Sequence, residues 1–157
     1  MPQWNYSFRI PDESKVAKAV IREVPVHPKV IVEIAKAING MNLKKAEKFL
    51  QNVIEQKEPV PFRRSNKKVS HKRGLSDRWG VPSGRYPIKA SKYVLKLLEN
   101  VENNAENKGL EVEKLVISHI AVSKGLTLKR AMPRAFGRAD VIRKFRSNVE
   151  VIVRMEE

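Results

Sequence analysis

The amino-acid sequence predicts an α+β fold, with three helices packed on a small antiparallel three-stranded sheet, a long extended β-hairpin arm and a basic loop insertion. Three observations predict it. With 157 residues, 41% of them hydrophobic, the chain is long enough for one domain, 1–157, that buries a core. Apolar residues recur at helical spacing in three segments and in strand-like runs in three others. Two strongly basic segments between these elements follow neither pattern.

The N-terminal half contains one predicted strand and two predicted helices. Between Lys15 and Val26, the valines at positions 16, 20, 24 and 26 fall on one parity, as in a strand. Pro28 suits the first turn of the helix that follows, and Gly40 suits its end. Asn42 is suited to cap the second helix. The apolar stripes of the two helices are Val30, Ile31, Ile34, Ala35 and Ile38, and then Leu43, Ala46, Phe49, Leu50, Val53 and Ile54.

The C-terminal half contains a third predicted helix and two predicted strands. The helix ends near Gly109, and its apolar stripe is Ala90, Val94, Leu97, Leu98, Val101 and Ala105. The strands, at 115–122 and 148–154, are expected to pair antiparallel as an extended hairpin at about 114–154, with its tip at about 125–142. At about 3.3 Å per residue, this connection folded double projects on the order of 30 Å. A hairpin of that length is not stable by itself in water, so we expect a partner surface.

The excess positive charge is confined to two blocks. The chain has 32 Lys and Arg against 17 Asp and Glu, a net charge of +15. The first basic block, 61–92, carries +9, the second basic block, 124–146, carries +7, and the rest of the chain carries −1. Because a merely solvated face would mix charges of both signs, the two blocks indicate a polyanionic partner.

The first basic block overlaps the predicted basic loop at about 57–87. This loop has no sustained apolar period and is broken by Pro59, Pro61 and Pro82, which predicts irregular structure that orders against its partner. Three aromatic residues lie among its cations: Phe62, Trp79 and Tyr86. They either stack on bases or anchor the loop to the domain, and the sequence leaves both alternatives open.

Other classes of function find no support in the sequence. The chain has no cysteine, so we expect no disulfide, thiol nucleophile or Cys-based zinc site. The absence of a signal-like N-terminus and of a long apolar run predicts a soluble intracellular protein. No catalytic or nucleotide-binding motif occurs, and His27, His71 and His119 lie far apart, so we expect no enzyme, cofactor, metal site or small-molecule substrate. His119 is expected to be a packed or edge residue of a strand, and Glu99, Glu102 and Glu106 to lie on the solvated face of the third helix.

Folded RNA is the polyanion that the basic blocks suit best. The junction Gly40-Met41-Asn42 permits a helix-turn-helix interpretation, but 28–56 carries only +2. A membrane-surface role needs a basic amphipathic helix, whereas both blocks contain Gly and Pro. Irregular basic extensions fit the crevices of folded RNA. A chromatin-type or other basic nucleic-acid-binding protein remains the alternative. The candidate RNA-binding residues are Arg63, Arg64, Lys67, Lys68, His71, Lys72, Arg73, Arg78, Trp79, Arg85 and Lys89 in the first block, and Lys124, Lys129, Arg130, Arg134, Arg138, Arg143, Lys144 and Arg146 in the second.

The segment TLKRAMPRAFGRAD at 127–140 closely resembles the hairpin tip of a universal family of large-subunit ribosomal proteins, number twenty-two in the bacterial scheme and seventeen in the eukaryotic one. The resemblance covers nearly the whole chain. AINGM at 37–41 is similar to the junction of that family's first two helices, and LLEN at 97–100 and NAENKGL at 104–110 to the end of its third helix. An insertion of archaeal and eukaryotic members is similar to VPFRRSN at 60–66, WG at 79–80 and GRYP at 84–87, and WNYSF at 4–8 looks archaeal.

The resemblance implies a structural protein of the cytoplasmic large ribosomal subunit that supports subunit assembly and translation. Its implied partners are large-subunit rRNA, neighbouring ribosomal proteins and the nascent polypeptide, because the hairpin of this family reaches along the peptide exit tunnel. Pro133 and Gly137 would shape the backbone at the tip. Ala131 and Met132 stand where relatives often carry bulkier or basic residues, which leaves open which side chain faces the tunnel. The implied tunnel-facing residues are Leu128, Lys129, Arg130, Ala131, Met132, Pro133, Arg134 and Ala135.

Overall fold

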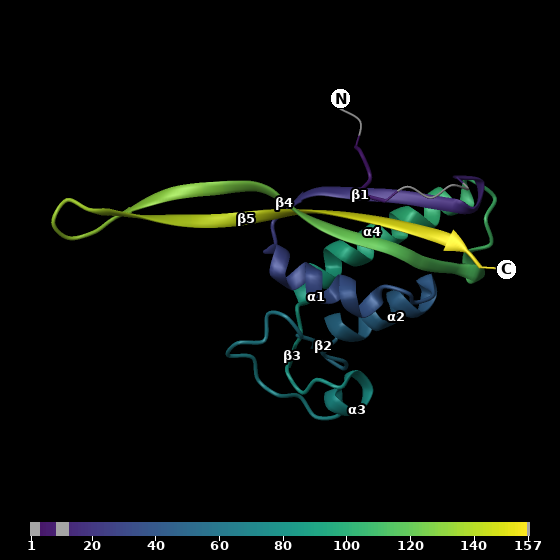
Figure 1. The fold of residues 1–157 in the computed structure, drawn as a ribbon, viewed down its shortest axis with the longest axis horizontal. Helices are drawn as coiled ribbons and strands as arrows, with labels where there is room; N and C mark the ends of the chain where they lie inside the picture. Colours follow the sequence, from purple (N-terminus) through teal and green to yellow (C-terminus); the bar gives the residue numbers. More distant parts are fainter. Residues whose placement is uncertain (1–3, 9–12, 157) are drawn as a thin grey trace.

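Three strands form the sheet on which the molecule is built, and the two longest are one continuous hairpin. The computed structural model describes residues 4–8 and 13–156. Strand β1 spans Val16–Val24, β4 spans Leu115–Pro133 and β5 spans Ala139–Met155. The strand order is β1-β5-β4, and both pairs of neighbours are antiparallel (Figure 1). The predicted antiparallel pairing of the two C-terminal strands is confirmed, and the strands continue through the second basic block instead of stopping before it.

Three helices cover one face of this sheet, as the sequence predicts (Figure 1). Helix α1 spans Pro28–Ile38, α2 spans Leu43–Ile54 and α4 spans Ile88–Glu106. Both predicted features of the helix starts are confirmed: Pro28 occupies the first turn of α1, and the Asn42 side chain caps α2 by accepting a hydrogen bond from the Lys44 N–H. α4 packs on β1 and α1 packs on β4, with α2 lying against α4.

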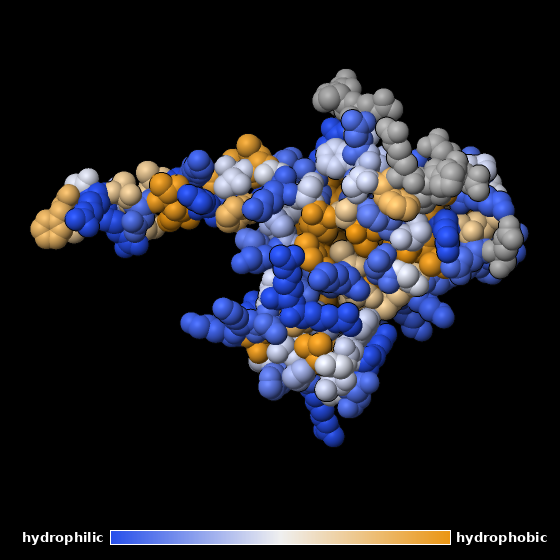
Figure 2. Space-filling model, in the orientation of Figure 1, coloured by the Kyte–Doolittle hydropathy of each residue, from blue (hydrophilic) through white to orange (hydrophobic). Residues whose placement is uncertain are grey.

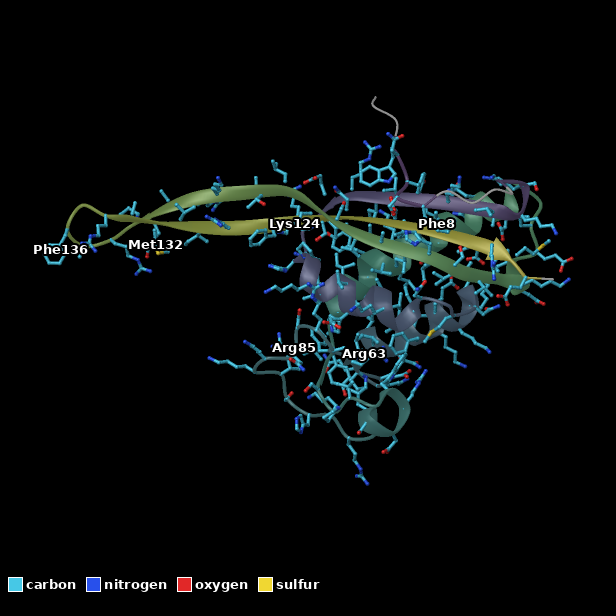
Figure 3. All side chains as sticks on the ribbon, viewed as in Figure 1. Phe8, Arg63, Arg85, Lys124, Met132 and Phe136 are labelled. Carbon is cyan, nitrogen blue, oxygen red and sulfur yellow. The ribbon has the colours of Figure 1, made fainter. Side chains whose placement is uncertain are left out.

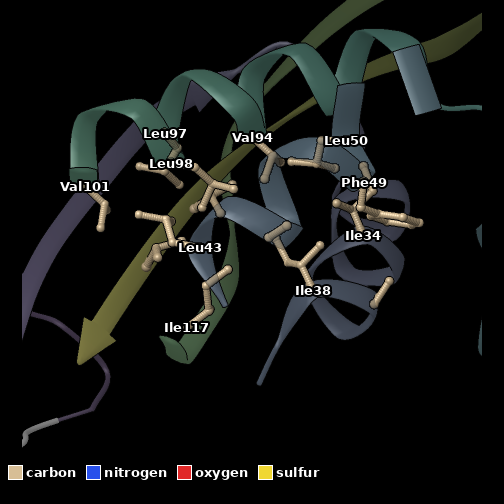
Figure 4. Close-up of a cluster of buried hydrophobic side chains, with 14 of the residues drawn as sticks. Ile34, Ile38, Leu43, Phe49, Leu50, Val94, Leu97, Leu98, Val101 and Ile117 are labelled. Atoms are coloured by element: carbon tan, nitrogen blue, oxygen red, sulfur yellow. The ribbon is translucent and has the colours of Figure 1, made fainter. Parts of the chain in front are cut away.

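The core lies between these helices and the sheet. The predicted apolar stripes supply it, except that Val30 and Ile54 are only half-buried. Each fully buried Leu or Ile side chain contributes about 1.5–3 kcal/mol of hydrophobic stabilisation. Figure 4 shows how the side chains of the three helices meet over β4, among them Ile34, Ile38, Leu43, Phe49, Leu50, Val94, Leu97, Leu98, Val101 and Ile117.

Strand β1 contains an irregularity that its valine pattern does not predict. Ala17 and Ala19 face the helices and are buried, whereas Val20 on the other parity is half-buried. The pairing with β5 shifts between Ile21 and Val24, so one extra residue is accommodated in β1. This bulge brings Val24 into the core with the alanines.

The basic loop contains regular structure, so the prediction of an irregular segment is wrong in part. Strands β2 (Val60–Pro61) and β3 (Gly84–Arg85) pair at its base, and the short helix α3 (Leu75–Trp79) lies between them. Gly74 and Gly80 bound α3 with φ of 73° and 68°. The buried side chains of Val60, Phe62 and Leu75 fix these short elements by tertiary packing rather than by periodicity. Single 3-10 turns precede β1 (Glu13–Lys15) and β4 (Val112–Lys114).

Candidate nucleic-acid interface

Two extensions of the molecule carry the two basic blocks, except that Lys89 and Lys92 of the first block lie on α4. The arm consists of residues 124–146, the part of the β4–β5 hairpin that lies beyond the pairing of β1 with β5 at Val24 and Ser147. The basic loop lies on the far side of α1 and α2 from the sheet (Figure 1). Figure 2 shows hydrophilic side chains over the loop and, mixed with apolar ones, along the arm.

The arm has no core of its own. Every residue from 128 to 144 is exposed, and in the described part of the chain this stretch of β4 pairs only with β5. A two-stranded ribbon without a covered apolar face is marginally stable in water. The exposed apolar residues of the arm include Leu126, Leu128, Met132, Phe136, Val141 and Ile142. The arm therefore offers a partner both cations and apolar surface.

The strand register places like charges directly opposite each other in the arm. Lys129 pairs with Arg143, so their side chains project from the same face. On the other face, Arg130 lies opposite Ile142 and Leu128 lies opposite Lys144. Like charges directly opposite in a sheet are destabilising, and an anion between them removes the penalty. Both faces of the arm therefore carry cations, and one face carries a pair suited to a phosphate.

The turn at the end of the arm is formed by residues 134–138. The Arg134 N–H donates to the Arg138 carbonyl oxygen at 2.8 Å, and the Arg134 Nε lies 2.8 Å from an Asp140 carboxylate oxygen. Phe136 and Gly137 have φ of 59° and 66°, which fits the role predicted for Gly137. Of the predicted tip residues, Arg134 and Ala135 lie in the turn, and the residues from Leu128 to Pro133 lie on β4 leading to it.

Phe136 is a residue that the sequence analysis missed. Its side chain is 97% exposed at the extreme end of the arm, and Met132 lies close to the same end (Figure 3). An aromatic residue beside a glycine within the predicted tip was the available signal, because the tip of an extended hairpin lies away from the core. It adds an apolar contact to the cationic tip.

Glu33 of α1 holds the start of the basic loop in place. Its carboxylate is 1% exposed and accepts hydrogen bonds from the backbone N–H groups of Arg63, Arg64 and Ser65 at 3.0, 3.0 and 2.8 Å. Three donors satisfy a carboxylate that burial would otherwise destabilise. The Arg63 and Arg64 side chains are exposed, so Glu33 fixes the backbone from which both guanidinium groups project.

The aromatic residues of the basic loop differ in their surroundings. Phe62 is 2% exposed and belongs to the core, and Trp79 packs against Phe49 with ring centroids 6.0 Å apart. The Trp79 ring also lies near the guanidinium groups of Arg63 and Arg78, at 5.7 and 5.2 Å. These contacts favour the anchoring alternative for Phe62 and Trp79. Tyr86 is half-buried, with the Lys72 ammonium 5.3 Å from its ring centroid.

The remaining predicted RNA-binding residues are spread over both extensions. Arg78 forms an ion pair with Glu58, and the half-buried Arg146 directs a guanidinium N–H toward the Glu23 carbonyl oxygen at 3.5 Å. Arg78 is nevertheless exposed. The other exposed ones are Lys67, Lys68, His71, Arg73, Arg85 and, on α4, Lys89 in the first block, and Lys124, Lys129, Arg130, Arg138, Arg143 and Lys144 in the second.

The other ionisable residues considered from the sequence lie elsewhere. His119 is half-buried in β4, where its Nε2 lies 3.0 Å from the Ser7 Oγ. Glu99 and Glu106 are exposed on α4, as expected, whereas Glu102 is half-buried and pairs with Lys44 of α2. Among residues 4–8 and 13–156, no group of three or more acidic or histidine side chains could hold a metal ion. Within the same residues, no helix is long and apolar enough to cross a membrane.

Comparisons with known proteins identify the family of this chain. The chain is 57% identical to the large ribosomal subunit protein uL22 of Aeropyrum pernix over 154 residues, which cover 98% of this chain and 99% of the relative. It is 54% identical to the uL22 protein of Staphylothermus marinus over 98% of each chain, and 48% identical to that of Methanocaldococcus jannaschii over 100% of this chain and 97% of the relative. The model of the family described as ribosomal protein L22p/L17e matches residues 19–154. The chain therefore belongs to the L22p/L17e family of ribosomal proteins, as an archaeal-type member.

Proposed function

We propose that this chain is a structural constituent of the large ribosomal subunit in the cytoplasm. In this proposal it binds large-subunit rRNA through the arm and the basic loop, and the tip of the arm lines the polypeptide exit tunnel. Its partners are then the rRNA, neighbouring ribosomal proteins and the nascent polypeptide. The family is one of ribosomal proteins, which is not an enzyme class, and the relatives named above are large-subunit proteins.

The single observation that carries the proposal is the exposed arm with its opposed cations. Lys129 faces Arg143 on a ribbon that buries none of residues 128–144, so the free arm lacks both a core and charge balance. Phosphate groups supply the missing charge, since Arg binds them with a planar fork of donors and Lys with a mobile point charge. Apolar residues between the cations suit the unstacked bases of folded RNA.

The α1–α2 pair gives little support to the alternative of a DNA-binding protein. A recognition helix would present unpaired cations near its start. In α2, Lys44 instead pairs with Glu102 of α4 and with Glu47, and these contacts, chiefly the one with Glu102, raise the pKa of its ammonium. Lys45 and Lys48 of α2 are also exposed, but residues 28–56 carry a net charge of only +2, and the excess charge lies in the two basic blocks.

A salt-titrated competition between large-subunit rRNA and duplex DNA tests the proposal. If about half of the 18 cations in the two blocks meet phosphates, the logarithm of the rRNA affinity falls with the logarithm of the salt concentration with a slope of roughly −6 to −8. The rRNA is expected to win at physiological salt. Preferential binding of the DNA would favour the chromatin-type alternative instead.

A photo-crosslinking experiment tests the placement of the tip in the tunnel. A photoreactive residue in place of Met132 is expected to crosslink a stalled nascent chain in assembled subunits. The same residue in place of Lys96, which is exposed on α4, serves as the control and is expected to yield none. Equal crosslinking from both positions, or none from Met132, would contradict the tunnel placement.

A further inference from the structure

A surface cavity of about 600 Å³ lies between the start of α1 and the basic loop. Cations from both elements line it: Lys29 of α1, and Arg64, Lys67 and Arg85 of the loop. Val30 and Phe62 form apolar parts of its wall, and the described lining residues include no acid. Its volume lies within the range of small-molecule sites, roughly 300–1,000 Å³.

A second, more apolar cavity of about 350 Å³ shares part of this wall. Val30, Phe62 and Arg85 line both cavities, so the two adjoin, with Arg85 at their common boundary. Val26, Tyr86, Pro87 and Ile88 are among the further residues that line the second cavity, and Lys89 adds a cation to Arg85. Together the cavities join an apolar compartment to a cationic one.

The walls are held in position before any ligand arrives. Glu33 fixes the backbone of Arg64 and Ser65, and the Arg85 guanidinium lies over the Phe62 ring at 5.6 Å. His27, on the rim of the cationic cavity, accepts a hydrogen bond from the Lys29 N–H through its Nδ1. Burial, together with the charges of Lys29 and Lys124, lowers the pKa of His27. A wall whose backbone is already held binds with a smaller ordering cost.

We propose that the two cavities hold one unpaired nucleotide of the rRNA. The base lies in the apolar compartment against Tyr86 and Pro87, and its phosphate lies among Lys29, Arg64 and Lys67. This inference rests on the proposed function and adds to it a specific place and chemistry. An unstacked base with its phosphate has the same combination of a flat apolar surface and an adjacent anion. The net charge of +9 on the surrounding block favours a polyanion over a single acidic side chain of a protein.

Two half-buried valines of α1 provide a matched test. Val30 borders both cavities, whereas Val32 borders a different surface cavity of about 160 Å³ beside Ile120 and Val122 of β4. In the full-length protein, Val30→Trp fills the proposed site and is expected to weaken binding to isolated large-subunit rRNA about tenfold, in line with the loss of one stacked base. Val32→Trp is expected to change the rRNA affinity by less than about twofold, which is the scatter of such measurements. Circular dichroism and thermal melting check that both variants fold.

A charge test covers the case in which Val30→Trp fails to fold. Lys29 lies outside the first basic block and is exposed, as is Lys45 on α2. Lys29→Ala is expected to make the salt slope of rRNA binding shallower by about one, whereas Lys45→Ala leaves it unchanged. If Lys29→Ala behaves like Lys45→Ala, the cavity binds no phosphate and the inference is wrong.

The remaining outcomes separate this inference from the proposed function. If Val30→Trp is folded and binds isolated rRNA like the wild type, the cavity is not a nucleotide site, although the wild-type protein remains an rRNA binder. If Val30→Trp is impaired only when other ribosomal proteins are present, the occupant is a protein segment and the inference is overturned. If the wild type shows no preference for rRNA over duplex DNA, the proposed function itself fails.

Discussion

At the scale of single residues, Glu23 fixes the point at which the arm leaves the sheet. It lies in the β1 bulge with φ of 54°, and its N–H donates to the Asn148 side-chain oxygen at 2.8 Å. Its carboxylate accepts the Leu126 N–H at 3.1 Å, close to a second bulge in β4 between Lys124 and Thr127. A Cβ at Gly125 would lie 2.6 Å from a Glu23 carboxylate oxygen, so a side chain at this position would force the carboxylate to move.

Gly125→Ala is expected to displace the Glu23 carboxylate and free the Leu126 N–H. The loss of a hydrogen bond to a charged group at a partly exposed site costs about 1 kcal/mol of unfolding free energy. Amide exchange of Leu126 and urea denaturation measure the two effects. In a Glu23→Ala background the obstruction is gone, so Gly125→Ala should cost little further stability. Equal costs in both backgrounds would contradict the proposed contact.

Glu150 is a second residue whose side chain holds a separate segment against the sheet. It is 4% exposed on the face of β5 opposite the helices, where its carboxylate accepts the Trp4 Nε1–H at 2.7 Å and the Ser7 N–H at 2.9 Å. Burial raises the pKa of Glu150, but the hydrogen bonds from Ser7 and Trp4 and the nearby His119 outweigh it and hold the pKa below its ordinary value of 4.5. The carboxylate thereby ties residues 4–8 to the sheet.

The attachment of residues 4–8 is expected to weaken in acid. Because the folded-state pKa of Glu150 is lowered, its stabilising contribution is complete above about pH 4.5 and is lost as the pH falls through the folded-state pKa. The indole N–H resonance of Trp4 is expected to shift in that window, whereas that of Trp79 stays constant. Glu150→Gln should remove the dependence, and an unchanged Trp4 titration in that variant would show that another group is responsible.

At the scale of elements, the arm is a ribbon whose sequence serves its partner at the expense of its own stability. Lys129 faces Arg143 on one face, and exposed apolar side chains line both strands. A hairpin selected for stability alone would place opposite charges across the strands. The residues that suit the arm to a partner therefore lower its stability in the free protein.

The substitution Lys129→Glu separates the stability of the free arm from its affinity for rRNA. The new carboxylate faces Arg143, which stabilises the free ribbon by about 0.2–1 kcal/mol and raises amide protection in the arm. The same change removes a phosphate contact and makes the salt slope of rRNA binding shallower by about one. Lys144→Glu is the matched control, because Lys144 lies opposite Leu128. This variant is expected to bind rRNA more weakly without any increase in amide protection of the arm. Lys129→Glu binding as tightly as the wild type would contradict the phosphate contact.

The elements differ in how far the sequence predicts them. The helices α1, α2 and α4 follow from long apolar periods and from the capping residues Pro28 and Asn42. β2, β3 and α3 are too short to show a period and depend on contacts such as Leu75 against Gly84, where a Cβ would lie 2.5 Å from the Leu75 side chain. The hydrogen bonds from the backbone of 63–65 to Glu33 join residues about thirty positions apart, and no local pattern in the sequence indicates them. The distribution of charge along the sequence predicts where the two extensions lie. It does not predict the contacts that hold them in place.

At the scale of the whole molecule, a nearly neutral body carries two cationic extensions. The body, outside 61–92 and 124–146, has a net charge of −1 and contains most of the core. The arm projects from one end of the sheet, and the basic loop lies beyond the helices (Figure 1). Separating the charge in this way allows the body to fold without the self-repulsion of a uniformly cationic surface.

The most direct test compares two variants with the same change in net charge. One replaces the arm cations Lys129, Arg130, Arg143 and Lys144 with Gln, and the other replaces the exposed body lysines Lys36, Lys45, Lys48 and Lys96 with Gln. The measurement is the fraction of each folded variant that cosediments with large ribosomal subunits after a high-salt wash. The arm variant is expected to be lost and the body variant retained. Equal retention or equal loss of the two would contradict the assignment of rRNA binding to the extensions.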